Sequence, residues 1–277
     1  QQPSCSLAPT GAGASHEPLG CSNRSLEQQT HVETMMRGTL PARIVDKVEA
    51  LKREAGIAAC SFVSSGMTLG LGTGSTVRYT VLEIGRRMAE EGLQVKGVPT
   101  SEATRYLAED LGIPLLTLKQ AGGIDLTIDG ADEFDPDFQL IKGGGGALTR
   151  EKRVAAASKA MVVVADDRKQ VPVLGRFDLP LEVDTGDWER VRDELVSICP
   201  GSVSLRGGQS SYVTDNGGYI LDCEFGPTIA NPGQLEELIL SVDGVVEVGL
   251  FVGMCDAVVM ATPSEVLTLV KQGGRLD

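Results

Sequence analysis

Histidine is nearly absent from this sequence. The chain has 277 residues and only two histidines, His16 and His31, both within the first 40 residues. These residues show no hydrophobic periodicity, so we expect them to lie outside the folded body. A body without imidazole excludes Ser-His and Cys-His nucleophilic systems and histidine metal sites. Acid–base chemistry would have to use Asp, Glu, Lys, Tyr or Cys.

Positive charge and long apolar runs are also scarce. The chain has 25 basic and 38 acidic residues, a formal net charge of -13. This charge opposes binding to nucleic acid or to an anionic membrane. No apolar run approaches the ~20 residues that a membrane-spanning helix needs. We therefore expect neither a nucleic acid nor a membrane as partner. A phosphorylated ligand would need a local site that attracts it despite the negative net charge of the chain.

Paired cysteine motifs are missing. The six cysteines are widely spaced with no C-x-x-C pair: Cys5, Cys21, Cys60, Cys199, Cys223 and Cys255. In a chain of this length they are predicted to be reduced structural thiols of an intracellular protein. We expect a cytoplasmic protein. The chain begins at Gln1 rather than Met, which leaves an organelle such as a plastid open.

The hydrophobic pattern predicts an α/β protein with two domains. Residues 1–38, rich in Ser, Gly and Gln, are expected to form a disordered extension. Strands and helices then alternate through residues 39–178, which predicts a Rossmann-like, mostly parallel sheet with helices on both faces. Residues 179–249 change to the order βαββαβ of a smaller ferredoxin-like α+β domain. Residues 250–277 are expected to return to the first sheet with a strand at Ala257–Ala261 and a helix from about Ser264.

A glycine-rich loop, Gly70-Leu71-Gly72-Thr73-Gly74-Ser75-Thr76, follows the first predicted strand and opens a helix. Glycines let the backbone approach an anion, and the helix N-terminus offers free N–H groups. The dinucleotide fingerprint would need Gly at Ser75, and a Walker A loop would need Lys before its Ser or Thr. A tight turn without a ligand stays open as the alternative.

The stretch Asp129-Gly130-Ala131-Asp132-Glu133 follows a predicted buried strand, Ile124–Ile128. It could be a solvated acidic turn. It could hold a divalent metal together with Asp135 and Asp137, although the spacing does not match an EF-hand loop. The third possibility is that these carboxylates bind sugar hydroxyls or move protons.

Lys142 precedes four glycines, Gly143–Gly146, after a short apolar segment predicted as a strand, Phe138–Ile141. In parallel sheets ligands bind at the carboxyl ends of strands. Four glycines disfavour any regular element, which favours a ligand that approaches the backbone or a positive φ. Glu151 lies in the first turn of the following helix and becomes the leading candidate for a base. Lys169 alone would be assigned to the surface.

Together these motifs resemble ribose-5-phosphate isomerases of type A. The matching segments are Gly72–Thr76, Asp129–Glu133, Lys142–Gly145 with Leu148–Lys152, Ala165-Asp166, Lys169-Gln170, Val213–Gly217, and Gly244–Val246 with Gly249–Phe251. The similarity runs from about Ile44 to near the C-terminus, and it is weakest between Asp184 and Gln209.

The resemblance implies a metal-free and cofactor-free aldose–ketose isomerase of the non-oxidative pentose phosphate pathway. Its substrate would be a small phosphorylated pentose, D-ribose 5-phosphate, converted to D-ribulose 5-phosphate through an enediolate. Glu151 would be the base, Asp129 and Asp132 would bind hydroxyls and assist ring opening, and Lys142 would stabilise the enediolate oxygen. The implied substrate contacts are Thr73, Gly74, Ser75, Thr76, Gly130, Ala131, Gly143, Gly144, Gly145 and Lys169. The family also favours a homodimer or homotetramer.

Two alternatives to this function stay open. A related sugar-phosphate deaminase or lactonase would be expected to use a histidine near its carboxylates. A non-catalytic sugar-phosphate sensor, such as the effector domain of a repressor, would need a basic DNA-binding module and would have no use for Glu151.

Overall fold

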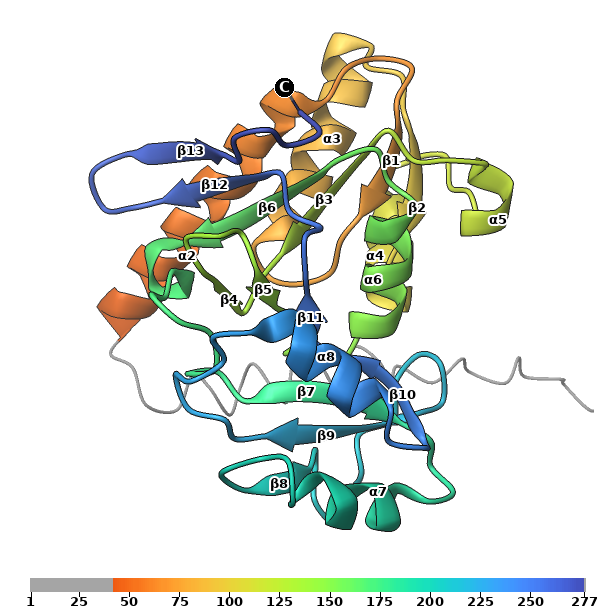
Figure 1. The fold of residues 1–277 in the computed structure, drawn as a ribbon. Coiled ribbons are helices and arrows are strands. Elements are labelled where there is room, and N and C mark those ends of the chain that lie inside the picture. Colours follow the sequence, from red (N-terminus) through yellow and green to blue (C-terminus); the bar gives the residue numbers. More distant parts are fainter. Residues whose placement is uncertain (1–41, 277) are drawn as a thin grey trace, which may run out of the picture.

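The computed structural model describes residues 42–276, and a six-stranded sheet forms the centre of its first unit (Figure 1). The strand order is β13-β12-β6-β3-β1-β2. The strands are β1 (Thr68–Leu71), β2 (Lys96–Pro99), β3 (Leu126–Gly130), β6 (Met161–Asp166), β12 (Ala257–Ala261) and β13 (Val266–Val270). Every neighbouring pair is parallel except β12 with β13. The predicted Rossmann-like, mostly parallel sheet is confirmed, whereas the predicted extension and both histidines lie outside the described residues.

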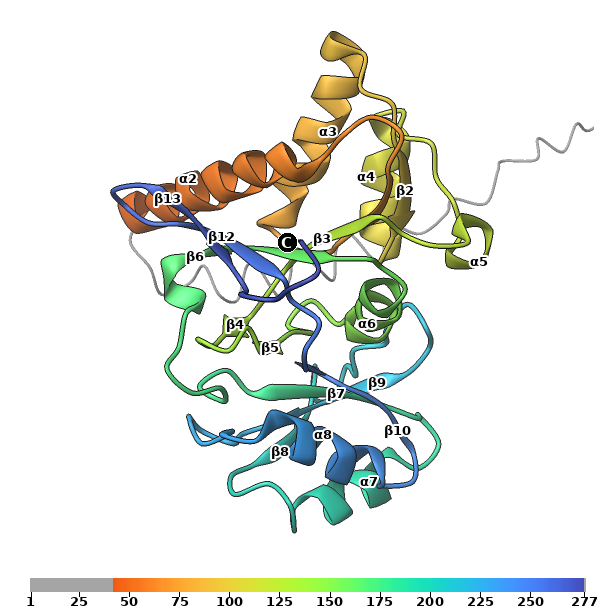
Figure 2. The ribbon, with the colours of Figure 1, turned by 45° about the horizontal axis from the view of Figure 1, so that its top comes forward.

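Helices cover both faces of this sheet, as expected (Figure 2). The helices are α2 (Ala42–Ala58) with the 3-10 turn Ala59–Phe62, α3 (Val77–Glu91), α4 (Glu102–Asp110), α5 (Leu118–Ala121) and α6 (Leu148–Ala156). Alternate residues of β6 show why both faces need cover. Val162 and Val164 pack in one apolar cluster with α3, while Met161 and Val163 pack in another with α6. Strands that are apolar on both sides are typical of buried parallel sheets.

The segment before Lys142 does not join the parallel sheet. Leu140–Ile141 forms β5, which pairs antiparallel with β4 (Glu133–Phe134) and β11 (Leu250–Phe251) in a separate three-stranded sheet. The expectation that this strand belongs with the parallel strands is therefore wrong. The reason is the short link after β4, because a parallel neighbour needs a crossover of a dozen or more residues.

The predicted helix from Ser264 is also wrong. Residues Val266–Val270 form the edge strand β13, after a tight turn in which Thr262 accepts hydrogen bonds from the backbone of Ser264 and Glu265. Exposure alternates along β13, with Leu267 and Leu269 packed against the core. This period of two is that of a half-buried strand.

The second unit has the predicted βαββαβ order. It contains β7 (Leu179–Val183), α7 (Trp188–Leu195), β8 (Val203–Leu205), β9 (Tyr219–Cys223), α8 (Pro232–Leu240) and β10 (Val245–Val248). Its antiparallel sheet has the order β10-β7-β9-β8, and α6 contacts β3 of the first sheet and β7 of the second. The residues at which one domain ends and the other begins stay a prediction. Helix α6 thus lies between the two units (Figure 2).

Candidate active site

Four segments of the first unit meet at the carboxyl ends of β1 and β3. They are the loop 72–76 after β1, the end of β3, the glycine loop 143–146 after β5, and the first turn of α6. Strands β1 and β3 are parallel neighbours, so their ends lie at one edge of the sheet. Of the four residues predicted to carry the chemistry, Asp129 and Glu151 lie in these segments, and Asp132 and Lys142 lie directly beside them.

Lys142 is the centre of the site. Its Nζ lies 3.1 Å from Asp129 Oδ2 and 3.4 Å from Glu151 Oε1, and it donates a hydrogen bond of 2.6 Å to the carbonyl of Gly130. The residue is only 2 % exposed. A buried ammonium is stable only when it is paired, and two carboxylates and one carbonyl provide that pairing here.

Asp129 is fully buried and holds its place through the backbone. Its Oδ1 accepts hydrogen bonds from the N–H groups of Thr73 (3.0 Å) and Gly130 (2.7 Å), while Oδ2 faces Lys142. The loop can approach this closely because residue 72 is glycine: a Cβ there would lie 2.2 Å from Asp129 Oδ1. The glycine loop after β1 is therefore shaped to fit the Asp129 carboxylate.

Glu151 is held less completely. Its Oε1 faces Lys142, whereas Oε2 is buried and, like Asp129 Oδ2, has no hydrogen-bond partner within residues 42–276. An unsatisfied buried carboxylate oxygen costs stability, and such a group indicates a functional role. Its position in the first turn of α6 was the only local signal in the sequence.

The charges of these three residues shift one another's proton affinities. Burial, followed by the charge of Asp129, raises the pKa of Glu151 to about 8. Burial also raises the pKa of Asp129, more than Lys142 and the backbone donors lower it. Burial by itself would lower the pKa of Lys142, but the charges of Asp129, Glu151 and Asp132 raise it. Lys142 therefore stays an ammonium, and Glu151 is the group that can exchange a proton near neutral pH.

The glycine loop presents its backbone to the same site. Gly143 and Gly146 have φ values of +110° and +76°, and the Gly144 N–H donates a 2.7 Å hydrogen bond to Asp132 Oδ2. A Cβ on Gly144 would lie 2.6 Å from Asp132 Oδ1. The positive φ values and this close approach explain why the loop needs glycines.

Two residues of the second unit hold this loop from the other side, and neither was singled out from the sequence. Arg206 donates to the carbonyls of Gly143 (2.8 Å) and Gly144 (3.2 Å), and Tyr212 donates to the carbonyl of Gly145 (3.2 Å). With their carbonyls bound, these peptide units turn their N–H groups away from Arg206. No local pattern signals such long-range contacts.

A cluster of hydroxyls lies beside the loop 72–76. Thr73 Oγ1 is 2.7 Å from Thr100 Oγ1 and 2.8 Å from Ser101 Oγ, and Thr104 donates to the carbonyl of Gly72. Ser101 is the N-cap of α4. Gly74 has a φ of +128°, and Thr76, which precedes α3, makes no side-chain capping bond. Backbone N–H groups at such a helix start can bind an anion, and the cap pattern at Ser101 was the one available signal for this cluster.

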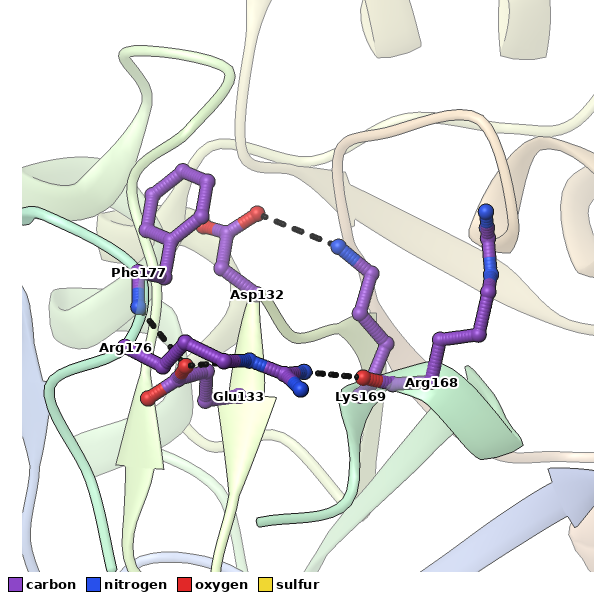
Figure 3. Close-up of a pocket in the computed structure, with 6 residues that line it drawn as sticks. All are labelled: Asp132, Glu133, Arg168, Lys169, Arg176 and Phe177. Atoms are coloured by element: carbon purple, nitrogen blue, oxygen red, sulfur yellow. Dashed lines mark hydrogen bonds and ion pairs between the residues drawn. The ribbon is translucent and has the colours of Figure 1, made fainter. Parts of the chain in front are cut away.

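Lys169 faces the site and is not a simple surface residue. Its Nζ lies 3.9 Å from Asp132 Oδ1, at a pocket of about 280 Å³ (Figure 3). The pocket is lined by Asp132, Glu133, Arg168, Lys169, Arg176 and Phe177. Arg168 is directed away from Asp132 and pairs with Asp166. Asp132 and Lys169 therefore give the pocket a carboxylate paired with a cation.

The acidic residues after β3 do not converge as ligands of one metal ion. Glu133 accepts hydrogen bonds from the backbone of Gly175 and Phe177, and Asp135 caps its own turn by accepting from Asp137 and Gln139. Within residues 42–276 no group of three or more acidic, cysteine or histidine side chains could hold a metal ion. Glu133 and Asp135 bind backbone N–H groups instead.

Comparison with known proteins shows which family the chain belongs to. A sequence model of ribose 5-phosphate isomerase A (phosphoriboisomerase A) matches residues 96–265, more than half of the chain. The chain belongs to the ribose 5-phosphate isomerase A family. The ribose-5-phosphate isomerase A of Bacillus mycoides is 45% identical over 213 residues, which cover 76% of this chain and 96% of that protein. The resemblance expected from the motifs is thereby confirmed.

Solved members of the ribose 5-phosphate isomerase A family share the fold. The enzyme of Methanocaldococcus jannaschii has a TM-score of 0.76 at 38% identity, over 80% of this chain and 99% of that one. A D-ribose-5-phosphate isomerase in complex with phospho-erythronic acid has a TM-score of 0.78 at 37% identity, with the same coverage. These similarities favour neither the sensor nor the deaminase or lactonase. The roles of individual site residues stay predictions.

Proposed function

We propose that this protein interconverts D-ribose 5-phosphate and D-ribulose 5-phosphate through an enediolate. The observation that carries the proposal is the pairing of Glu151 with Lys142, 3.4 Å apart and almost fully buried, with one carboxylate oxygen left free. A base beside a cation is what proton abstraction next to a carbonyl requires. Membership of the ribose 5-phosphate isomerase A family supports the choice of substrate.

The phosphate would bind at the start of α3. Thr73, Gly74, Ser75 and Thr76 offer backbone N–H groups and hydroxyls there, and Lys169 would add a positive charge. The phospho-erythronic acid bound by a solved relative supports a phosphorylated, sugar-derived ligand. A local site of this kind would attract the phosphate despite the net charge of -13.

The proton would be moved by Glu151. The free oxygen of its carboxylate takes the proton from C2 of the open-chain aldose, the C2–H electrons form the C1=C2 bond, and the carbonyl electrons move to O1. The O2 proton then passes to O1, the C2 carbonyl forms, and Glu151 returns its proton to C1. One carboxylate serves both steps, so no proton is gained or lost overall.

The negative charge of the enediolate would be stabilised by the Lys142 ammonium and by N–H groups of Gly143 to Gly145. The two aspartates would have different roles. Asp132, which faces the pocket, would bind a substrate hydroxyl and assist ring opening, with Gly130 and Ala131 lining that side. Asp129 has no exposed surface, so in the free protein it acts by holding Lys142.

One assay tests the proposal. Purified protein is mixed with D-ribose 5-phosphate in the presence of EDTA, and ketose formation is followed. The expected result is conversion to an equilibrium mixture that is also reached from D-ribulose 5-phosphate. Binding without conversion would favour the sensor, and release of ammonia from an amino sugar phosphate would favour the deaminase.

We further propose a homodimer or homotetramer that works in the cytoplasm, in the non-oxidative pentose phosphate pathway. The four cysteines of the described residues are free thiols, which fits a reducing compartment. No described helix has the length and apolar character to span a membrane. Leu238, Leu240 and Val246 are exposed apolar side chains on α8 and the edge strand β10, a surface suited to a second copy. Light scattering of the purified protein measures the oligomeric state.

A further inference from the structure

The first turn of α6 is attached to the second unit on both sides of Glu151. Lys152 binds Glu236 (2.5 Å), Glu247 (2.7 Å) and the carbonyl of Val248 (2.6 Å). Thr149 and Arg150, on the other side of Glu151, also bind residues of the second unit. Of these four consecutive residues, only Glu151 faces the active site.

Arg150 makes three directed hydrogen bonds. Its Nε donates to Asn216 Oδ1 (2.8 Å), one Nη donates to the carbonyl of Asp215 (2.8 Å), and the other donates to Glu102 Oε1 (2.9 Å). Asp215 Oδ2 in turn accepts from the N–H of Glu102 (2.8 Å). A planar guanidinium with three acceptors at fixed angles constrains its own backbone more than a single ion pair does.

The turn that carries Asp215 and Asn216 is itself anchored in the interior. Glu182 of β7 is 1 % exposed, and it accepts hydrogen bonds from Thr149, from Thr214 (2.6 Å) and from Asn216 Nδ2 (3.3 Å). The turn and α6 therefore share a buried acceptor as well as the Arg150 bonds. Movement of α6 relative to the second unit would break both sets of contacts.

We propose that Arg150, bound by the Asp215–Asn216 turn, is a positioning residue that keeps the Glu151 carboxylate against Lys142. Glu151 cannot hold this place alone, because among the described residues its carboxylate pairs only with Lys142 and its second oxygen has no hydrogen-bond partner. The position of its carboxylate thus depends on the backbone of α6. The inference rests on the proposed isomerase function and deepens it, since it gives the second unit a part in proton transfer.

The test replaces Arg150 by methionine, with Arg105→Met as the matched control. Arg105 binds the same partner, Glu102, with similar side-chain exposure (33% against 31%), but has no bond to the turn. In Arg150→Met we expect kcat to fall by about ten- to a hundredfold, as a misplaced catalytic group would cause, with little change in KM. The acid limb of the pH–kcat/KM profile should also shift, because Lys142 lowers the pKa of Glu151 while burial and the charges of Asp129 and Asp132 raise it, and a displaced carboxylate changes its distance to all three residues. Arg105→Met should change neither.

Hydrogen exchange supplies a readout independent of activity. Backbone N–H groups of α6 should exchange faster in Arg150→Met than in Arg105→Met. If Arg150→Met does not fold, Asn216→Ala removes one of the same bonds at the surface and should shift kcat and the profile in the same direction. An unchanged kcat in the variants, or an equal loss in Arg105→Met, would overturn the inference. Failure of the isomerase function is a different result, since the unaltered protein would then form no ketose.

Discussion

The sharpest test of the proposed mechanism is Glu151→Gln. The substitution keeps the shape of the side chain, and the amide oxygen can still accept a hydrogen bond from Lys142, 3.4 Å from the present Oε1. It removes only the ability to take a proton. Substrate binding and the fold should therefore change little, while the chemical step loses its base.

The size of the loss follows from the role of the base. A positioned general base contributes about 10²–10⁴ in rate, which corresponds to about 3–5 kcal/mol of barrier. Because Glu151 would act in both proton transfers, we expect the loss in both directions of the reaction. Above pH 8 the variant should be the more stable protein, since a buried negative charge is then replaced by a neutral amide.

The assay is ketose formation from D-ribose 5-phosphate in the presence of EDTA, with substrate varied to separate kcat from KM. Asp256→Asn is the matched control. Asp256 is also a buried carboxylate (3 % exposed), but its side chain accepts from Arg275 and from the backbone N–H of Met161 rather than from site residues. The control should lose stability and keep its kcat. An unchanged kcat in Glu151→Gln would refute the assignment of the base.

Three further predictions follow from the same contacts. Lys142→Ala should raise the activation barrier by about 3 kcal/mol and so lower kcat, by analogy with a lost oxyanion donor. It should also lower the melting temperature, because two buried carboxylates lose their cation. Full activity would contradict the role of Lys142. The pH–kcat/KM profile should fall below a pKa near 8 as Glu151 takes a proton, and the limb should be absent from Glu151→Gln. Since this pKa lies above the ordinary 4.5, the folded state binds more protons than the unfolded state between these two pH values. The free energy of unfolding of the unaltered protein, relative to that of Glu151→Gln, should therefore decrease from pH 4.5 to 8, which denaturant titrations at each pH measure. Gly144→Ala should displace Asp132, whose Oδ1 would be 2.6 Å from the new Cβ. The variant should lose about 1–3 kcal/mol of stability and also lose activity. Gly186→Ala is the neutral control, because a Cβ there would meet a single atom at 3.5 Å.

Much of the fold could be predicted from the sequence because its strands and helices have strong local patterns. The two errors have different causes. Leu140–Ile141 is apolar enough for a parallel strand, but its short link to β4 allows only an antiparallel neighbour. The segment after Ser264 alternates with a period of two, and that signal was available for Val266–Val270.

The site was predictable to the extent that its residues share short motifs at strand ends. Asp129 and Lys142 lie at or just after the ends of strands, Glu151 lies in the first turn of a helix, and the structure brings the three together. Arg206 and Tyr212 were missed because their contacts with the glycine loop span more than 60 residues of sequence. Asp129 is fully buried and Asp132 is not. This difference depends on the folded loop around Gly72 and cannot be seen in the motif.

The division of labour between Asp129 and Glu151 depends on hydrogen bonding rather than on the type of side chain. Both are carboxylates beside Lys142, and one ammonium cannot neutralise two negative charges. Asp129 accepts two backbone N–H groups, which favour its ionised form, whereas Glu151 has none. The proton shared by this pair is therefore expected on Glu151. A folded body without histidine thus has a base that titrates near neutral pH, because two backbone N–H groups favour the ionised form of Asp129 and no described backbone N–H binds the Glu151 carboxylate.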